Sequence, residues 1–133
     1  MSRNQKDAAL QSTRALPTAD GTVTSLDFDL ETVSPGIAVE NFELLVSVPA
    51  LTATHLPNAD TLTLTVQTGP AATPTTSTGI THVITGAGGA GAPAQAIRFS
   101  LPSTIARYVN VKIVAAGGTG DMSAVSATLN LAL

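Results

Sequence analysis

The chain has 133 residues, a formal net charge of −3 at pH 7, 44% hydrophobic residues and no cysteine. A chain of this length suits a single domain with a substantial core, and the lack of cysteine excludes disulfides, thiolate metal sites and cysteine nucleophiles. Only 11% of the residues are charged and 3% aromatic, so we expect a neutral surface and an aliphatic core. A general nucleic-acid-binding protein would need a basic patch, and this composition does not indicate one.

The N-terminal region is expected to form an arm, residues 1–20, ahead of a folded domain, residues 21–133. The arm contains Arg3, Lys6 and Arg14, half of the six basic residues, and ends in the turn signal PTADG. One strand inside the arm, within AALQSTRAL, is also compatible with the pattern. The arm lacks the apolar run of a secretory signal and no segment is predicted to span a membrane, so we expect folding in the cytosol and no membrane partner.

Alternation of apolar and polar residues with a period of two predicts β-strands along the whole domain. The first run, TVTSLDFDL, is expected to bury Leu26, Phe28 and Leu30. The later runs are FELLVSV, TLTLTVQT, ITHVIT, AIRFSL, RYVNVKIVA and SAVSATLNLAL. Turn residues separate the runs, including the low-complexity stretches TGPAATPTTSTG and TGAGGAGAP, which should lie at opposite ends of one strand. About seven to eight short strands and no helical periodicity predict an all-β fold, an antiparallel β-sandwich or jelly roll.

The stretch TGAGGAGAP contains the G-x-G-x-x-G pattern of dinucleotide-binding loops at Gly86, Gly88 and Gly91. That function requires a helix directly after the glycines and an acidic residue about 20 positions later. Here Pro93 and a predicted strand follow, and the next acidic residue is Asp121. We therefore expect a loop that is either mobile or held close against the backbone of a neighbour, where only small residues fit.

Three carboxylates, Asp27, Asp29 and Glu31, are expected on one face of a strand at spacings of about 6.6 Å. The spacing fits a Ca²⁺ site or a pair of glycosidase carboxylates, but also a solvated or partner-facing strand. We favour the last, because a glycosidase normally has aromatic platforms. His55 and His82 have no carboxylates at metal-binding spacing and no G-x-S-x-G motif occurs, so no catalytic, cofactor-binding or metal-binding residue is nominated.

The run RYVNVKIVA is expected to bury Val109, Val111 and Ile113 and to present a polar face. That face would consist of Arg107, Tyr108, Asn110 and Lys112. A solvated outer sheet and a subunit interface both fit it, since Tyr and Arg are enriched at interfaces. Leu45 interrupts the alternation of its own strand and is expected to project outward.

Taken together, three stretches carry a resemblance: ADTLTLTVQTGPAATP, the glycine and alanine loop, and IRFSLPSTIARYVNVKIVAAGGTGDMSAVSATL. The chain resembles the small jelly-roll cement, or decoration, proteins of tailed bacteriophage capsids, over roughly residues 7–132. DAALQSTRALPTADGTVTSLDFDL is similar to the N-terminal segment of that family. The resemblance implies a non-enzymatic homotrimer without cofactors. It would be made in the host cytoplasm and bind the major capsid protein on the outside of the virion.

Under this resemblance, capsid binding is expected at the basic arm and the glycine loop, through Arg3, Lys6, Arg14, Gly88 and Gly89. The trimer interface is expected at Arg107, Tyr108, Lys112 and Leu45. Bridging of adjacent capsomers would strengthen the head against the pressure of packaged DNA. The alternatives are a carbohydrate-binding or receptor-binding sandwich of a head fibre or tail, a structural protein of the tail or baseplate, and an enzyme with a polar pocket.

Overall fold

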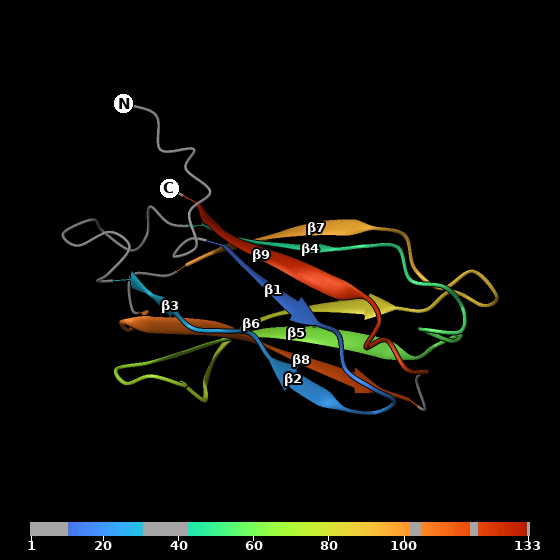
Figure 1. The fold of residues 1–133 in the computed structure, drawn as a ribbon, viewed down its shortest axis with the longest axis horizontal. Helices are drawn as coiled ribbons and strands as arrows, with labels where there is room; N and C mark the ends of the chain where they lie inside the picture. Colours follow the sequence, from blue (N-terminus) through green and yellow to red (C-terminus); the bar gives the residue numbers. More distant parts are fainter. Residues whose placement is uncertain (1–10, 31–42, 102–104, 118–119, 133) are drawn as a thin grey trace.

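The computed structural model describes residues 11–30, 43–101, 105–117 and 120–132. These residues form two β-sheets that face each other (Figure 1). The strands are β1 (Gln11–Ala15), β2 (Thr22–Thr24), β3 (Phe28–Asp29), β4 (Glu43–Val48), β5 (Thr61–Gly69), β6 (Thr76–Thr85), β7 (Gln95–Ser100), β8 (Tyr108–Ala116) and β9 (Ser126–Ala132). No helix long and apolar enough to cross a bilayer occurs in the described part of the chain.

The strand order is that of a jelly roll. Sheet A has the order β1-β9-β4-β7, sheet B has the order β2-β8-β5-β6, and β3 also pairs with β8. All of the pairings are antiparallel. If β2 and β3 are taken as one interrupted strand, the chain changes sheet at every connection except the β5–β6 hairpin. This is the pattern of two interlocked Greek keys, so the predicted all-β jelly-roll sandwich is confirmed.

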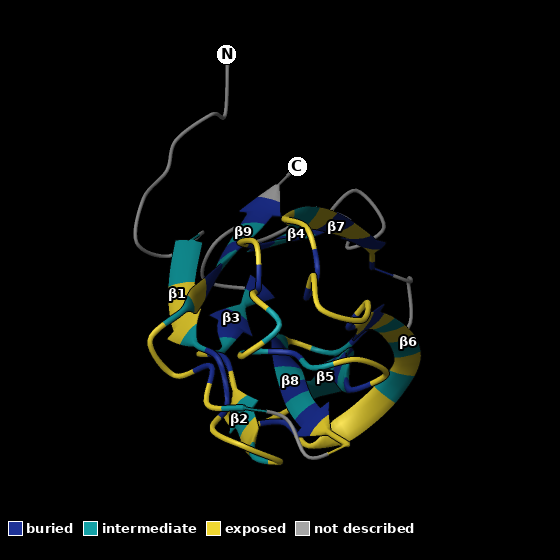
Figure 2. Ribbon diagram, turned by 90° about the vertical axis from the view of Figure 1, so that its right-hand side faces the viewer, coloured by how far each residue is buried: buried dark blue, intermediate teal, exposed yellow. Residues whose placement is uncertain are grey.

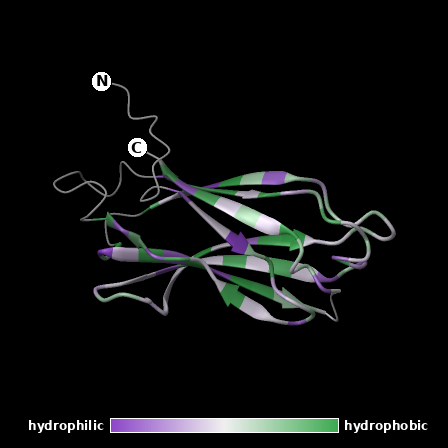
Figure 3. Ribbon diagram, in the orientation of Figure 1, coloured by the Kyte–Doolittle hydropathy of each residue, from purple (hydrophilic) through white to green (hydrophobic). Residues whose placement is uncertain are grey.

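The core lies between the sheets and follows the predicted alternation (Figures 2 and 3). Strands β4, β5 and β9 each turn three apolar side chains inward and β8 turns four, all of them buried. These residues are Leu44, Val46, Val48, Leu62, Leu64, Val66, Val109, Val111, Ile113, Ala115, Ala127, Leu129 and Leu131. Phe28 and Phe99 are the aromatic members of the described core. An aliphatic core of this kind derives its stability from the apolar area that it removes from water.

The prediction that Leu26 is buried is wrong. Its side chain is 71% exposed, whereas Ser25 is 5% exposed. Ser25 N donates to the carbonyl oxygen of Val111, and Ser25 Oγ accepts from Val111 N, each at 2.9 Å. The serine hydroxyl thus takes the place of one backbone acceptor for β8. Between Ser25 and Phe28 the alternation of inward and outward side chains shifts by one residue, and this shift separates β2 from β3.

Half of the run TGPAATPTTSTG, predicted as a loop, belongs to strands: its first two residues end β5, and its last four begin β6 at Thr76. The pairing of β5 with β6 shifts register between Thr65 and Gln67. Gly79 lies in the extra length of β6 with a φ of 82°. The hydroxyl of Thr78 donates to Val66 O, at 2.9 Å, where the backbone ladder is interrupted. The turn itself covers only residues 70–75, and it and the glycine loop lie at opposite ends of β6, as expected.

Part of the predicted arm belongs to the sandwich. Residues 11–15 form β1, which pairs with β9 over five residues and forms an edge of sheet A. Leu16, directly after it, is 1% exposed. The sequence QSTRA alone hardly predicts a strand, because most of its side chains are polar. Such an edge strand forms mainly through its pairing with the neighbouring strand. Arg3, Lys6, Glu31 and Phe42 lie outside the described residues.

Candidate interaction surfaces

The densest group of polar contacts pins the β5–β6 turn onto the outer face of sheet B. Asp27 Oδ2 accepts from Thr73 N at 2.6 Å, and Asp27 Oδ1 accepts from Asn110 Nδ2 at 3.1 Å. Asn110 Nδ2 also donates to Pro74 O at 3.2 Å, and Gln67 Nε2 donates to Thr75 O at 3.2 Å. We call Asp27, Gln67 and Asn110 the clasp. It joins strand β8 and the β2–β3 segment to a turn remote in sequence.

The clasp corrects one sequence prediction. Asn110 was expected on a polar outer face, and it does lie on the outer side of β8, but the turn covers it so that it is 1% exposed. Gln67 is 6% exposed for the same reason. The Oδ1 atom of Asn110 is buried and has no hydrogen-bond partner. The amide is oriented by its two acceptors, because both the carboxylate and the carbonyl require a donor.

Arg107 makes contacts with residues of its own chain. Its Nε and Nη2 atoms donate to Asp29 Oδ1 and Oδ2 at 2.8 and 2.9 Å, a side-on bidentate pair. Its guanidinium also lies over the ring of Tyr108, 5.0 Å from the centroid. Leu30 N donates to Arg107 O at 2.8 Å. Arg107 therefore fastens β3 to the start of β8, and the expected ladder of free carboxylates is bonded internally at Asp27 and Asp29.

The structure places the four expected trimer-contact residues on two different surfaces. Tyr108 and Lys112 point outward from sheet B and are partly exposed, with Arg107 beside them. Leu45 points outward from β4 in sheet A, between Asn130 and Arg98. One neighbouring molecule packed flat against either face therefore cannot contact all four, and their role in a trimer stays a prediction.

The glycine loop packs against the backbone of its own chain. A Cβ atom at Gly86 would lie 2.1 Å from Pro57 O, and one at Gly91 would lie 2.0 Å from Leu51 O. The amide of Gly86 is already bonded to Asp60 O at 2.9 Å, and that of Ala87 to Gly91 O at 2.8 Å. The amides of Ala90 and Ala92 are bonded as well, so four amides of the loop already have acceptors within the chain. The need for small residues was correctly expected, but the neighbour is the segment 51–60.

Gly88 and Gly89 form the exposed tip of this loop. A Cβ atom at Gly88 would meet only the Asn58 side chain, at 3.2 Å, and one at Gly89 would meet nothing within 4 Å. Arg14 is exposed on the edge strand β1. These three predicted capsid contacts are accessible, and contact with a capsid stays a prediction for each of them.

The histidines and the end loops make local contacts. His55 Nδ1 accepts from Thr52 N at 3.4 Å, and His82 Nε2 lies 3.0 Å from Gln95 Oε1, which links β6 to β7. Hydrogen bonds from the hydroxyl and the backbone N–H of Ser123 hold the pKa of the Asp121 carboxyl below its ordinary value. The described residues contain no group of three His, Asp or Glu side chains that could hold a metal ion.

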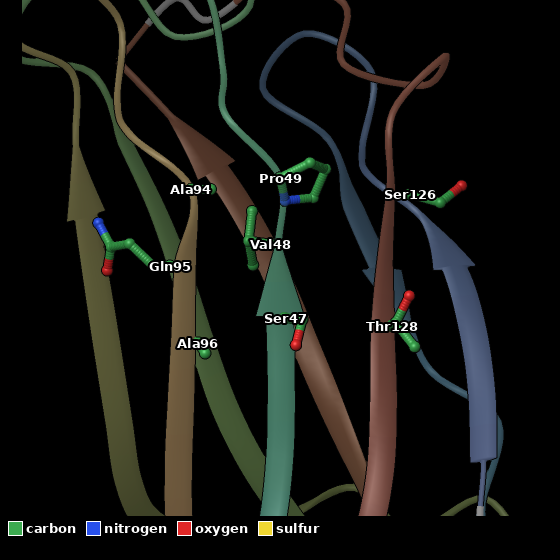
Figure 4. Close-up of a pocket in the computed structure, with 8 residues that line it drawn as sticks. All are labelled: Ser47, Val48, Pro49, Ala94, Gln95, Ala96, Ser126 and Thr128. Carbon is green, nitrogen blue, oxygen red and sulfur yellow. The ribbon is translucent and has the colours of Figure 1, made fainter. Parts of the chain in front are cut away.

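A shallow hollow of about 470 Å³ lies on the outer side of sheet A, between β4, β7 and β9 (Figure 4). Its lining residues are Ser47, Val48, Pro49, Ala94, Gln95, Ala96, Ser126 and Thr128. They supply three hydroxyls and one amide but no titratable side chain. The hollow can therefore accept hydrogen bonds or small apolar groups, and its lining offers no general acid or base.

Both outer faces are poor in charge. On sheet B the outward residues away from the clasp and the Arg107–Asp29 pair are Thr22, Thr24, Thr61, Thr63, Thr65, Thr81, Val83, Thr85, Lys112, Val114 and Ala116. Lys112 is the only charge among them, and Tyr108 lies beside the partly exposed Arg107–Asp29 pair at one end of this face. On sheet A the charged pair is Arg98 and Glu43, 3.4 Å apart and largely exposed, a contact worth little in solution. These faces share the low charge of interface centres, although serine and alanine are themselves depleted there and aromatic residues are enriched.

Comparison with known proteins adds no family: no family model matches the chain, and no curated protein matches it. The surfaces must therefore be interpreted from their own geometry. Sequence reasoning missed the clasp, because its members lie in three separate segments. A signal was present in the polar residues Gln67 and Asn110, which occupy matching positions of two predicted strands.

Proposed function

We propose that the protein is a cement protein of a tailed-bacteriophage head. It binds the major capsid protein on the outer surface, bridges adjacent capsomers as a trimer and stabilises the shell against DNA pressure. The observation that carries this proposal is that several polar side chains are hydrogen-bonded inside the sandwich, while most outward side chains of the strands are uncharged. Asp27, Asp29, Arg107 and Asn110 are bonded within the sandwich, while the outer faces offer neutral, small side chains suited to contact.

The fold supports the same function. A jelly roll with an aliphatic core and loops bonded to one another is a rigid body, and rigid partners lose little conformational entropy when they bind. The resemblance described above points to the same class of protein. The alternative of a carbohydrate-binding module has less support, because the single tyrosine, Tyr108, is stacked by Arg107 and no tryptophan is present.

The test is binding of the purified protein to DNA-filled heads of the same phage that lack this protein. The heads are mixed with the protein, sedimented and heated, and both occupancy and the temperature of DNA release are measured. We expect saturable binding to the shell and release at a higher temperature. Heads that sediment without the protein at low and at moderate salt would overturn the proposal.

The trimer is tested separately by light scattering after size exclusion. Tyr108→Ala changes the outer side of sheet B, and Leu45→Ala is its matched variant on sheet A. We expect the wild type to have the mass of a trimer and one of the two variants to lower it, which identifies the contacting face. A trimer that both variants leave intact would contradict these contact residues.

A further inference from the structure

The four edges of the sandwich differ in how they are protected against pairing with another chain. An edge strand exposes unpaired backbone donors and acceptors, and proteins usually block such edges with charges, proline, short strands or kinks. On one side, β1 has five residues and carries Arg14, while β2 and β3 have three and two residues and are separated at Ser25. On the other side, β7 carries Arg98.

Strand β6 lacks most of these protections, and its one irregularity, the register shift around Gly79, lies in its first half. It is ten residues long, TSTGITHVIT, with neither a charged residue nor a proline, and among the described strands it pairs only with β5. Figure 2 shows it along one side of the molecule with mostly exposed residues. In its first half, Ser77 Oγ accepts from Gly79 N at 3.0 Å, and Thr78 Oγ1 accepts from Ile80 N at 3.1 Å. The second half, residues 81–85, is the part with no such side-chain cap on its amides among the described contacts.

The second half of β6 is also self-complementary. Its outward side chains are Thr81, Val83 and Thr85, a sequence that is the same in both directions. Val83 is 50% exposed, and with Leu26 it is one of two exposed large apolar side chains among the described residues. In an antiparallel pair of two such strands, Val83 would lie opposite Val83 and Thr81 opposite Thr85. Cross-strand pairs of β-branched residues stabilise a sheet.

We propose that β6 is the contact through which two copies of this chain pair, antiparallel, about a twofold axis at Val83. The two B sheets then form one continuous sheet, in which the row Thr22, Val114, Thr63 and Val83 continues into its counterpart. The contact buries the exposed Val83 side chains and satisfies edge backbone groups. It is small compared with a stable interface, so the pair forms in a concentration-dependent way. This inference does not depend on the proposed capsid function.

The first test uses the absence of cysteine from the chain. Directly opposite residues of an antiparallel pair have Cα atoms about 4.5–5.5 Å apart, within the range of about 4.4–6.8 Å that a disulfide spans. Under mild oxidation we expect Val83→Cys to form a covalent dimer at least about tenfold faster than Thr22→Cys. Thr22 is the matched control, because it is exposed in the same row but on the opposite edge strand. Equal rates would overturn the proposal.

The second test measures mass by sedimentation over a wide concentration range. Val83→Lys places two like charges opposite each other at the axis, whereas Thr22→Lys adds the same charge at the far edge. We expect the wild type and Thr22→Lys to form pairs, or assemblies of pairs, that Val83→Lys loses. A wild type that stays monomeric at the highest concentration overturns the proposal. If the wild type is a trimer and the Val83→Lys variant has the same mass, the proposed β6 pairing is overturned. The capsid proposal is not affected by that result.

Discussion

At the level of single residues, Gly91 has the most demanding position in the glycine loop. Its φ is 68°, and a Cβ atom would lie 2.0 Å from Leu51 O, at the bridge where Leu51 and Ala92 exchange two hydrogen bonds of 2.9 Å. The left-handed conformation alone costs a non-glycine residue about 1–2 kcal/mol. We expect Gly91→Ala to lower the free energy of unfolding by more than that, because the bridge must also move.

Gly89 is the matched control for this prediction. Its φ is 73°, but a Cβ atom there would meet nothing within 4 Å. Gly89→Ala should therefore lose only the conformational term of about 1–2 kcal/mol. Urea unfolding with an unchanged denaturant slope measures both values. Equal losses in the two variants would show that close packing against the segment 51–60 contributes nothing.

The same residues show what a sequence reveals at this scale. The glycine spacing indicated a close approach of backbones, but it could not distinguish a neighbouring molecule from residues 51–60 of the same chain. Alternation placed Asn110 on the outer side of its strand, yet the turn that buries it contributes Pro74, 36 positions away. Which face a side chain occupies is a local property, whereas what covers that face is not.

At the level of elements, the clasp should determine how firmly the β5–β6 turn is held. Asp27→Ala removes the acceptor of Thr73 N and one of the two acceptors of Asn110 Nδ2. We expect the free energy of unfolding to fall by about 1–3 kcal/mol, because one N–H of the buried Asn110 amide then lacks an acceptor, while the other keeps Pro74 O. Hydrogen exchange should become faster at Thr73 in particular. The measurement combines urea unfolding with amide exchange resolved by residue.

Asp121→Ala serves as the control for the clasp. Asp121 is exposed and accepts a local hydrogen bond from Ser123 N at 2.8 Å, so its removal should change stability little and leave Thr73 exchange unaffected. If Asp27→Ala also left Thr73 exchange at the wild-type rate, the clasp would not be what holds the turn.

The strands themselves were largely predictable, because each inward face is apolar and the period of two is strong in β4, β5, β8 and β9. The break between β2 and β3 was not predictable from that period. It depends on Ser25 Oγ replacing a backbone group opposite Val111, and a serine in a strand gives no sign of such a contact. The start of β6 was missed because TTSTG has the composition of a loop, although threonine also favours strands.

At the scale of the whole molecule, the number of strands and the absence of helical periodicity were enough to predict an antiparallel sandwich or jelly roll, and the family resemblance favoured the jelly roll. The interaction surfaces were not predictable to the same degree. Leu45 and Lys112 belong to opposite sheets, and a sequence gives the phase of each strand without assigning it to a sheet. The unprotected edge of β6 likewise becomes apparent only once the strand order shows which strands have a single neighbour.

The final prediction concerns the N-terminal region and head binding. Because residues 11–15 form β1 and Leu16 is buried, a deletion that tests the arm should end at residue 10. We expect the variant lacking residues 1–10 to keep the melting temperature of the sandwich and to bind heads more weakly. Removal of residues 1–16 should instead lower the melting temperature, since it takes away an edge strand and a core side chain.

The full-length double variant Arg3→Gln, Lys6→Gln separates the effect of charge in the arm from the effect of its length. If the arm acts through charge, the double variant should bind heads as weakly as the shorter deletion does at low salt. Its difference from the wild type should disappear as salt is raised, because exposed charges are screened beyond about 10 Å at 0.1 M. Occupancy equal to that of the wild type at low salt would contradict a role for the arm.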